Sequence, residues 1–141
     1  MFEYIRKQLN MEEIDIVNYS PLTLAYIGDS IYELLIRTMI VAKGNTSVNK
    51  LHQRSARLVK ASAQAQMILG LKELLTEEEM AVYKRGRNAK SYTMAKNATM
   101  KDYRNATGLE ALMGYLYLTK QDDRMMELVR QGLEIIDGRN E

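Results

Sequence analysis

Several residue types that carry common protein chemistries are missing or scarce in this sequence. Its 141 residues include no cysteine, no tryptophan, one proline and one histidine, His52. Without cysteine the chain has no disulfide, no zinc–thiolate site and no thiol nucleophile, and a reducing compartment is expected. With a single histidine, catalysis by two imidazoles and metal binding by a histidine cluster are excluded as well.

Long apolar runs and glycine-rich phosphate loops are also missing. No apolar run reaches the roughly 18 residues that a membrane span needs, and residues 1–16 lack the regions of a signal peptide. Neither G-x-x-x-x-G-K-[ST] nor G-x-G-x-x-G occurs, so nucleotide binding by such a loop has no support. We therefore expect a cytoplasmic protein without a membrane segment.

The spacing of apolar residues is helical along nearly the whole chain, which predicts an all-α fold. The length suits one domain over residues 1–141, with a core over about residues 20–137. The stretch before residue 100 has little apolar period and is expected to be the one long loop. The expected helices cover residues 21–42, 47–69, 76–87, 102–119 and 123–136, and the loop covers residues 86–100.

Short signals mark where some of these helices begin and end. Ser20 offers its hydroxyl to an unpaired N–H of the first turn, and Pro21 has no N–H to leave unpaired. Thr76 and Glu79 have the spacing of a capping box. Gly44 suits the left-handed backbone that ends a helix. The boundaries at these positions are therefore predicted to be sharp.

Basic residues are segregated along the chain, although the formal net charge is only +2. Residues 34–72 contain seven Lys or Arg and no acid, and residues 80–101 contain six more, again without an acid. Such blocks give the surface one positive side, which favours a polyanionic partner. Solvated helix faces explain the same pattern, so the charges alone leave both interpretations open.

The 21–42 helix is predicted to be apolar on two sides at 100° per residue. Because one side faces the core, the other is expected to be covered by a partner subunit. The expected core stripe is Leu24, Ile27, Ile31, Leu34 and Leu35. The opposite side carries Leu22, Tyr26, Ile36 and Ile40 beside Asp29 and Glu33.

Asp29 and a second carboxylate, Glu110 on the 102–119 helix, therefore lie in apolar surroundings, where a carboxylate is costly unless it is paired or binds a cation. If the two meet across their helices, their oxygens form a hard anionic site. Mg²⁺ is the typical occupant because it needs few protein oxygens, and it supports metal-assisted hydrolysis of a phosphodiester. The alternative is that Asp29 pairs with a buried arginine such as Arg37. Glu33 is expected either to lie at the helix surface or to support the metal ligands without binding the metal itself.

Two motifs in these helices, LAYIGDSIYELL and ATGLEALMGYLYL, resemble the signature of the ribonuclease III family. In that family a Leu-Glu-Phe-Leu-Gly-Asp helix is paired with a later Asp-x-x-Glu-Ala-Leu-x-Gly helix. The resemblance covers about residues 20–137. No double-stranded-RNA-binding domain follows in the sequence, which is typical of the smallest subgroup of the family. The resemblance implies an all-α endonuclease domain that is a helical bundle and forms a homodimer.

By position, the resemblance assigns Asp29 and Glu110 as the catalytic and metal-binding carboxylates, with Mg²⁺ as the cofactor and Mn²⁺ as an acceptable substitute. Tyr26 takes the place of an aromatic residue that packs into the partner subunit. Ala25 and Thr107 stand where the family has two more carboxylates, so a site with few protein ligands is expected. The family's architecture implies that each subunit cuts one strand of an RNA duplex.

The substrate that the resemblance implies is double-stranded RNA, in particular the precursor of 23S ribosomal RNA, and a large-subunit ribosomal protein is a candidate partner. A-form RNA is recognised through its shape, phosphates and 2′-hydroxyls, for which charged side chains on helices are suited. For the loop over residues 86–100, an RNA contact and a solvated loop without contacts both remain open. The residues expected to bind RNA are Lys50, Arg54, Arg57, Arg85, Arg87, Lys90 and Lys96.

Two other functions remain open at this stage. The first is a non-catalytic RNA-binding or ribosome-assembly module on the same fold, although the presence of both Asp29 and Glu110 argues against it. The second is an all-α, Mg²⁺-dependent nucleotide pyrophosphatase, for which the nearest acidic cluster, residues 77–79, resembles a helix N-terminus instead. Adding Mg²⁺ to the protein with duplex RNA separates the first from a nuclease, and hydrolysis of a nucleoside triphosphate without RNA cleavage would favour the second.

Overall fold

The computed structural model of the chain describes residues 1–90 and 99–140, and the elements in these residues are all helical, as the sequence predicts. None of these helices is long and apolar enough to cross a membrane. The elements are α1 (Phe2–Gln8), η1 (Ile16–Asn18), α2 (Pro21–Ala42), α3 (Val48–Val59), α4 (Ala61–Leu71), η2 (Lys72–Leu74), α5 (Glu77–Asn88), α6 (Met100–Leu118) and α7 (Asp122–Asn140), where η denotes a short 3₁₀ helix.

The helix boundaries predicted from capping residues are confirmed. The Ser20 hydroxyl accepts the backbone N–H of the third residue of α2, and Pro21 is the first residue of that helix. Both hydrogen bonds of the capping box between Thr76 and Glu79 are present at the start of α5. Gly44 has a φ of 134°, a backbone conformation that side chains rarely adopt. The sequence therefore identified the starts of α2 and α5 and the turn after α2.

The single helix predicted over residues 47–69 is wrong, because the chain breaks at Lys60 into α3 and α4. Lys60 is extended, with φ −63° and ψ 154°. Two side chains stabilise the break by hydrogen bonding to carbonyl groups that the end of α3 leaves free. The Tyr32 hydroxyl of α2 and the Gln64 amide of α4 each donate to a carbonyl of the last turn of α3. The two acceptors are the carbonyl oxygens of Leu58 and Val59, each at 2.8 Å.

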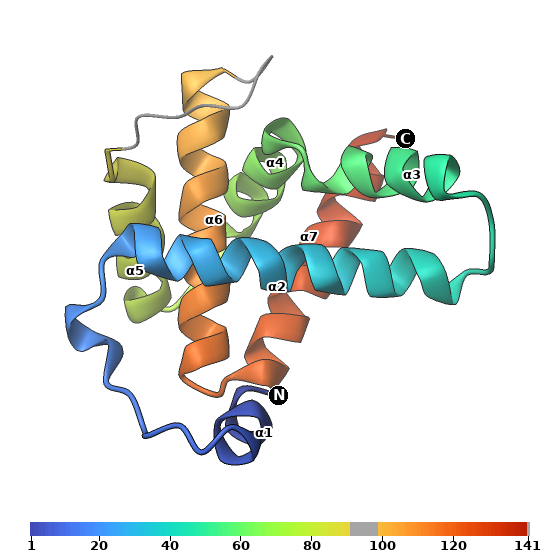
Figure 1. Cartoon of the computed structure of the whole chain (residues 1–141). Helices are drawn as coiled ribbons and strands as arrows, with labels where there is room; N and C mark the ends of the chain where they lie inside the picture. The colour runs from blue at the N-terminus through green and yellow to red at the C-terminus, as the bar shows by residue number, and fades with distance from the viewer. Residues whose placement is uncertain (91–98, 141) are drawn as a thin grey trace.

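Helix α6 is the centre of the bundle, with α2, α4 and α5 packed around it (Figure 1). At the crossing of α2 and α6 the two backbones touch. A Cβ atom added to Gly28 of α2 would lie 1.7 Å from the Glu110 carbonyl oxygen, and one added to Gly114 of α6 would lie 2.0 Å from the Leu24 carbonyl oxygen. The two glycines therefore allow α2 and α6 to approach each other more closely than any side chain would permit.

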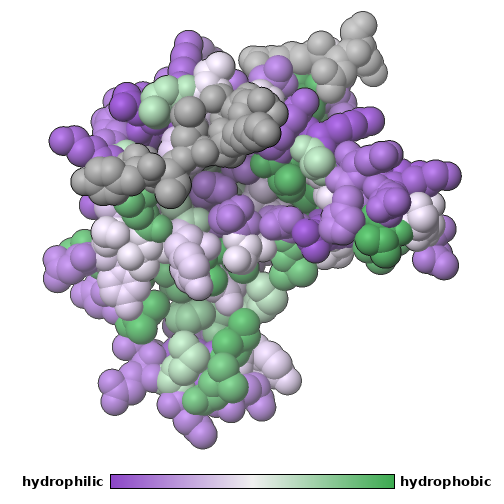
Figure 2. Space-filling view, turned by 45° about the horizontal axis from the view of Figure 1, so that its top comes forward, coloured by the Kyte–Doolittle hydropathy of each residue, from purple (hydrophilic) through white to green (hydrophobic). Residues whose placement is uncertain are grey.

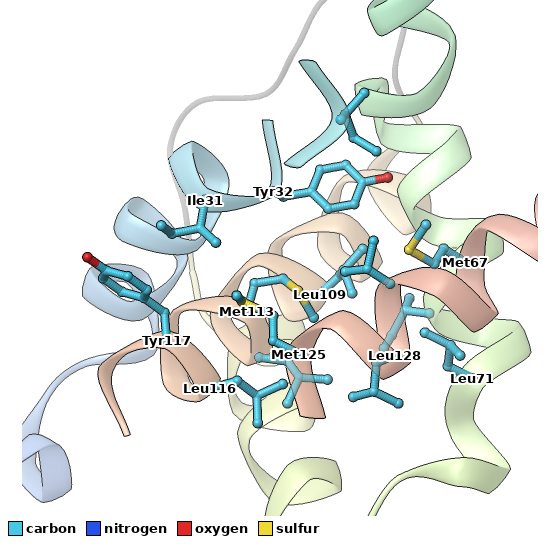
Figure 3. Packing of buried hydrophobic residues seen from close by; sticks show 14 of the residues in the cluster. Ile31, Tyr32, Met67, Leu71, Leu109, Met113, Leu116, Tyr117, Met125 and Leu128 are labelled. Carbon is cyan, nitrogen blue, oxygen red and sulfur yellow. The ribbon is translucent and has the colours of Figure 1, made fainter. Parts of the chain in front are cut away.

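The main core lies between α4, α6 and α7, and α2 covers it from the other side. Figure 3 shows Met67 of α4 and Leu128 of α7 close to Leu109 and Met113 of α6. All four side chains are fully buried. Apolar packing of this kind is the main stabilising contribution to a domain of this size, and it fixes the position of α6.

The core face predicted for α2 is partly wrong. Leu24 and Ile31 are buried as expected, but Leu34 is 47 % exposed. Ile36 and Ile40, which were assigned to the opposite side, are buried in the core instead. The reason is that α3 folds back over the C-terminal half of α2 and covers a different face there. Of the residues assigned to the opposite side, Leu22 and Tyr26 in the N-terminal half of the helix are the exposed apolar ones.

The ends of the chain contain two features that the sequence did not predict. Helix α1 packs through Phe2, whose ring centroid lies 5.6 Å from that of Tyr117 on α6. Glu3 of α1 forms ion pairs with Arg6 and Lys120. Helix α7 continues beyond residue 136, where the prediction ended, to Asn140. The first helix is thus held against the end of α6 by one aromatic pair and by charges.

Candidate active site

The two carboxylates of interest meet at the crossing of α2 and α6. Gly28 lies against the Glu110 backbone, so the next residue of α2, Asp29, is placed beside the Glu110 side chain. The two side chains are close enough to hydrogen bond with each other. Asp29 is exposed, whereas Glu110 is half-buried. Asp29 and Glu110 therefore do meet across their two helices, which was the condition for a cation site in the sequence analysis.

Burial and the neighbouring acid change the protonation of Glu110. The pKa of Glu110 is raised from 4.5 to about 8, mainly by burial and in addition by the charge of Asp29 and their mutual hydrogen bond, while hydrogen bonding with Gln64 acts in the opposite direction. Burial and the Glu110 charge likewise raise the pKa of Tyr32. A divalent cation bound between the two side chains would stabilise both in their charged form.

The alternative that Asp29 pairs with Arg37 is wrong, because Arg37 pairs with a different carboxylate. Arg37 forms an ion pair of 2.7 Å with Glu33, one turn away on the surface of α2. In the described part of the chain, no lysine or arginine forms an ion pair with Asp29 or Glu110. Glu33 is thus a surface acid, as expected, and the charge of the Asp29 and Glu110 pair is left without a protein cation.

The two positions at which the family has further carboxylates do not supply substitutes. Ala25 is buried against Val82 and Ala111 in a small apolar cluster. Thr107 donates its hydroxyl to the Tyr103 carbonyl oxygen of the same helix, at 3.0 Å. Across residues 1–90 and 99–140, no group of three or more acidic or histidine side chains is placed to hold a metal ion. A metal bound here would have two protein carboxylates at most.

Glu110 makes the stability of the metal-free protein depend on pH. Because its pKa is about 8 in the folded chain and near 4.5 when unfolded, the free energy of unfolding falls as the pH rises from about 4.5 to about 8. Glu110→Gln should therefore stabilise the metal-free protein at pH 8.5 by roughly 2–4 kcal/mol and have little effect at pH 4. Urea unfolding with a chelator present measures this, and Glu33→Gln is the control. Equal pH dependence in wild type and Glu110→Gln would contradict the assignment.

Gln64 of α4 is a neighbour of Glu110 that sequence reasoning missed as a site residue. Its side chain is 3 % exposed and lies within hydrogen-bonding reach of the Glu110 carboxylate. The sequence analysis expected one continuous helix over residues 47–69 here. The break at Lys60 turns α4 toward α6, and no local signal predicts that break.

Most of the predicted RNA-binding residues lie on the surface on two different helices. Three of them, on α3, are all exposed, and Figure 2 shows hydrophilic side chains over the arm that α3 forms with the end of α2. Arg85 and Lys90 are exposed at the end of α5, whereas Lys96 lies outside the described residues. The three residues on α3 are Lys50, Arg54 and Arg57.

Arg87 differs from the other predicted residues because it is half-buried in a basic pocket. Its guanidinium lies 5.4 Å from the ring centroid of the buried Tyr83, and the ammonium of Lys72 lies 5.5 Å from the same centroid. Lys101 and Arg104 from the first turns of α6 line the pocket as well. Lys72, Lys101 and Arg104 were not singled out from the sequence, because they come from different segments and meet only in the fold.

The arrangement of helices matches that of a known enzyme family. The Ribonuclease III domain model matches residues 22–121, which include α2, α6 and both carboxylates. The crystal structure of a protein from Fusobacterium nucleatum is similar to this chain, with a TM-score of 0.75 and 30 % sequence identity over 82 % of this chain and 88 % of that one. The chain therefore belongs to the ribonuclease III family.

Within that family the similarity is to the Mini-ribonuclease 3 proteins, the subgroup that the sequence indicated. The protein of that name from Clostridium tetani is 51 % identical over 117 residues, which are 82 % of this chain and 78 % of the relative. The one from Enterococcus faecalis is 48 % identical and covers 90 % of this chain and 98 % of the relative. The one from Staphylococcus aureus is 43 % identical, covering 92 % and 98 %.

Proposed function

We propose that this protein is a Mg²⁺-dependent endoribonuclease of the ribonuclease III type, which cleaves double-stranded RNA as a homodimer. The observation that carries the proposal is the pair of carboxylates, Asp29 and Glu110, that face each other at the α2–α6 crossing and form no ion pair with a lysine or arginine of residues 1–90 and 99–140. The membership of the chain in the ribonuclease III family gives the chemistry of that pair a direct interpretation. The site then serves phosphodiester hydrolysis.

The residues present fit a Mg²⁺ ion. Asp29 and Glu110 provide hard oxygen ligands, and their mutual repulsion is relieved by a cation. When bound, such an ion activates water and neutralises charge on a phosphodiester. The protein's part is to hold both carboxylates in place through the rigid contact at Gly28 and Gly114. Because Glu110 keeps its proton to about pH 8, cation binding displaces that proton, and affinity rises with pH up to that value.

A cleavage assay on a defined RNA duplex tests this function. Cleavage is expected with Mg²⁺ or Mn²⁺ and is expected to stop when excess chelator is added. Binding of the duplex without cleavage under either condition would instead support an RNA-binding module on the same fold. Hydrolysis of a nucleoside triphosphate with the duplex left intact would support the pyrophosphatase alternative. The same assay on single-stranded RNA of equal length measures the preference for duplex.

The proposed natural substrate is the precursor of 23S ribosomal RNA, with a large-subunit ribosomal protein as a candidate partner. This part of the proposal rests on the resemblance to the ribonuclease III family. Its test is the accumulation of 23S precursor with unprocessed ends when the gene is deleted, and the restoration of mature ends by wild-type protein but not by Asp29→Asn. Normal 23S ends in the deletion strain would contradict it.

Duplex recognition is expected to involve Arg87 and Lys90 at the end of α5. Each phosphate contact that is lost lowers the salt dependence of binding by roughly 0.9 units, because fewer counterions are released. Arg87→Ala combined with Lys90→Ala should therefore weaken duplex binding, lower the salt slope by roughly one to two units and leave Mg²⁺ affinity unchanged. Binding titrations at several salt concentrations measure this.

A matched control for that variant is Lys7→Ala, an exposed lysine on α1 at the far end of the molecule (Figure 1). Its salt slope should equal that of the wild type. An unchanged slope in the double variant would mean that the end of α5 makes no RNA contact. Recognition would then be assigned to the α3 residues Lys50, Arg54 and Arg57.

Tyr26 is proposed to be at the centre of the dimer interface. Its side chain is 79 % exposed on the N-terminal half of α2, beside Leu22 at 38 % and near Val17 in the preceding segment at 73 %. A self-complementary contact of such apolar side chains is typical of a two-fold dimer. Tyr26→Asp should weaken dimerisation roughly 30-fold or more, as expected for a central aromatic residue.

Sedimentation velocity over a range of concentrations measures the dissociation constant of the dimer. Tyr4→Ala is the control, because Tyr4 is a similarly exposed tyrosine, 69 % accessible, on α1. The control should dimerise as the wild type does. A wild-type protein that is monomeric at micromolar concentration would end the dimer proposal.

A further inference from the structure

Gln64 has one polar atom that the protein does not satisfy. The amide Nε2 donates a hydrogen bond of 2.8 Å to the Val59 carbonyl oxygen, at the break between α3 and α4. The amide oxygen, Oε1, is buried and has no hydrogen-bond partner within residues 1–90 and 99–140. The whole side chain is 3 % exposed, so bulk water does not solvate it freely. A buried amide oxygen in this state is unfavourable unless a donor or a cation reaches it.

The orientation of this amide is fixed by its partner. Turning the amide over would direct Oε1 at the Val59 carbonyl oxygen, and two acceptors would then face each other. The break at Lys60 presents this carbonyl to the amide, because the extended backbone there ends the hydrogen bonding of α3. Oε1 is therefore the end of the side chain that is available for other interactions.

Gln64 also contacts the carboxylate that faces Asp29. The Gln64 amide lies within hydrogen-bonding reach of the Glu110 side chain. Three oxygen-bearing side chains, one each from α2, α4 and α6, thus meet at one place. A neutral amide oxygen is an accepted ligand for hard cations, and it adds a ligand without adding more negative charge. This matters here because positions 25 and 107 carry no acid.

We propose that Gln64 is the third oxygen donor of the divalent-cation site, with Oε1 bound either to the cation or to one of its water molecules. The inference rests on the proposed function, since it concerns the same site. Gln64 then has two roles that a hydrophobic residue cannot take: its amide nitrogen anchors the side chain to the Val59 carbonyl oxygen, and its amide oxygen completes the donor set. In this chain it replaces part of what the missing carboxylates would supply.

Cation binding without RNA tests the inference independently of cleavage. The probe is Mn²⁺ alone, titrated into the full chain at pH 8.5 and followed by calorimetry and by the loss of its free electron-spin signal. Gln64→Met removes both polar groups at nearly constant volume and should weaken Mn²⁺ binding roughly 10- to 100-fold, as loss of a supporting ligand does. Its metal-free melting temperature should change by only a few degrees, because the unsatisfied amide oxygen is lost together with the hydrogen bond to the Val59 carbonyl oxygen.

Gln66→Met is the matched control, since Gln66 is exposed on the same helix, and it should bind Mn²⁺ as the wild type does. Wild-type Mn²⁺ affinity in Gln64→Met would overturn the inference, whatever the metal-free melting temperature.

If Gln64→Met fails to fold, the variant Gln64→Glu provides the test. It should bind Mn²⁺ at least about tenfold more tightly than the wild type, and unchanged or weaker binding would overturn the inference. Failure of Asp29→Asn to weaken binding would contradict the proposed function itself and is thereby distinguishable.

Discussion

Asp29→Asn and Glu110→Gln are each expected to lower the rate of duplex RNA cleavage roughly a thousandfold or more, which corresponds to about 4 kcal/mol of transition-state stabilisation. The reason is that only these two carboxylates in the described site are available to hold a cation, so the loss of either leaves one charged ligand. Single-turnover cleavage of a defined duplex at saturating Mg²⁺ measures the effect. Duplex binding, measured in the presence of Ca²⁺ or without metal, should change little because neither substitution removes a basic residue.

Glu33→Gln is the matched control for these variants. Glu33 lies one turn from Asp29 on α2 but points to the surface, where it pairs with Arg37. An exposed pair of this kind contributes little to stability, so both folding and cleavage should remain close to those of the wild type. Wild-type cleavage by Asp29→Asn or Glu110→Gln would refute the site assignment. A comparable loss in Glu33→Gln would show that the active site extends farther along α2.

Gly28→Ala and Gly114→Ala are expected to be the most destabilising small substitutions in the chain. At each position the new Cβ would lie 1.7 or 2.0 Å from a carbonyl oxygen of the facing helix, and backbone cannot move aside as a flexible side chain can. The helices α2 and α6 would have to separate. We expect a loss of about 3 kcal/mol or more in the free energy of unfolding and a melting temperature lower by roughly 10 °C or more.

Gly138→Ala provides the control, because a Cβ added there meets nothing within 4 Å and the residue is exposed on α7. Alanine is the better helix former, so this variant should be neutral or slightly more stable. The variant at Gly28 should also lose Mn²⁺ affinity if it folds, since the carboxylates on the two helices move apart. Wild-type stability of Gly28→Ala would show that the crossing of α2 and α6 is looser than described.

The sequence contained enough information for most of the helices and for the central pair of acids. Ser20, Thr76 and Gly44 act through hydrogen bonds or backbone angles within a few residues, so their effects can be predicted locally. Asp29 and Glu110 were found because a carboxylate in an apolar helix requires a partner, whatever the rest of the fold. Both kinds of prediction depend on short-range chemistry.

The features that the sequence did not reveal depend on contacts between distant segments. The break at Lys60 is stabilised by the Tyr32 hydroxyl from α2, and no proline or glycine marks it. That break determines where Gln64 points, so the amide beside Glu110 could not be predicted either. Ile36 is buried because α3 folds back over α2. The spacing of apolar residues within α2 cannot predict this contact.

The division of the carboxylates between two helices also has a consequence for the cell that makes this protein. Asp29 and Glu110 come together only through the contact of α2 with α6, and α6 is among the last segments to leave the ribosome. In a nascent chain, Asp29 therefore has no carboxylate partner until α6 has been synthesised and has packed against α2. A folded molecule whose α2 detaches from α6 loses the pairing of the two carboxylates in the same event.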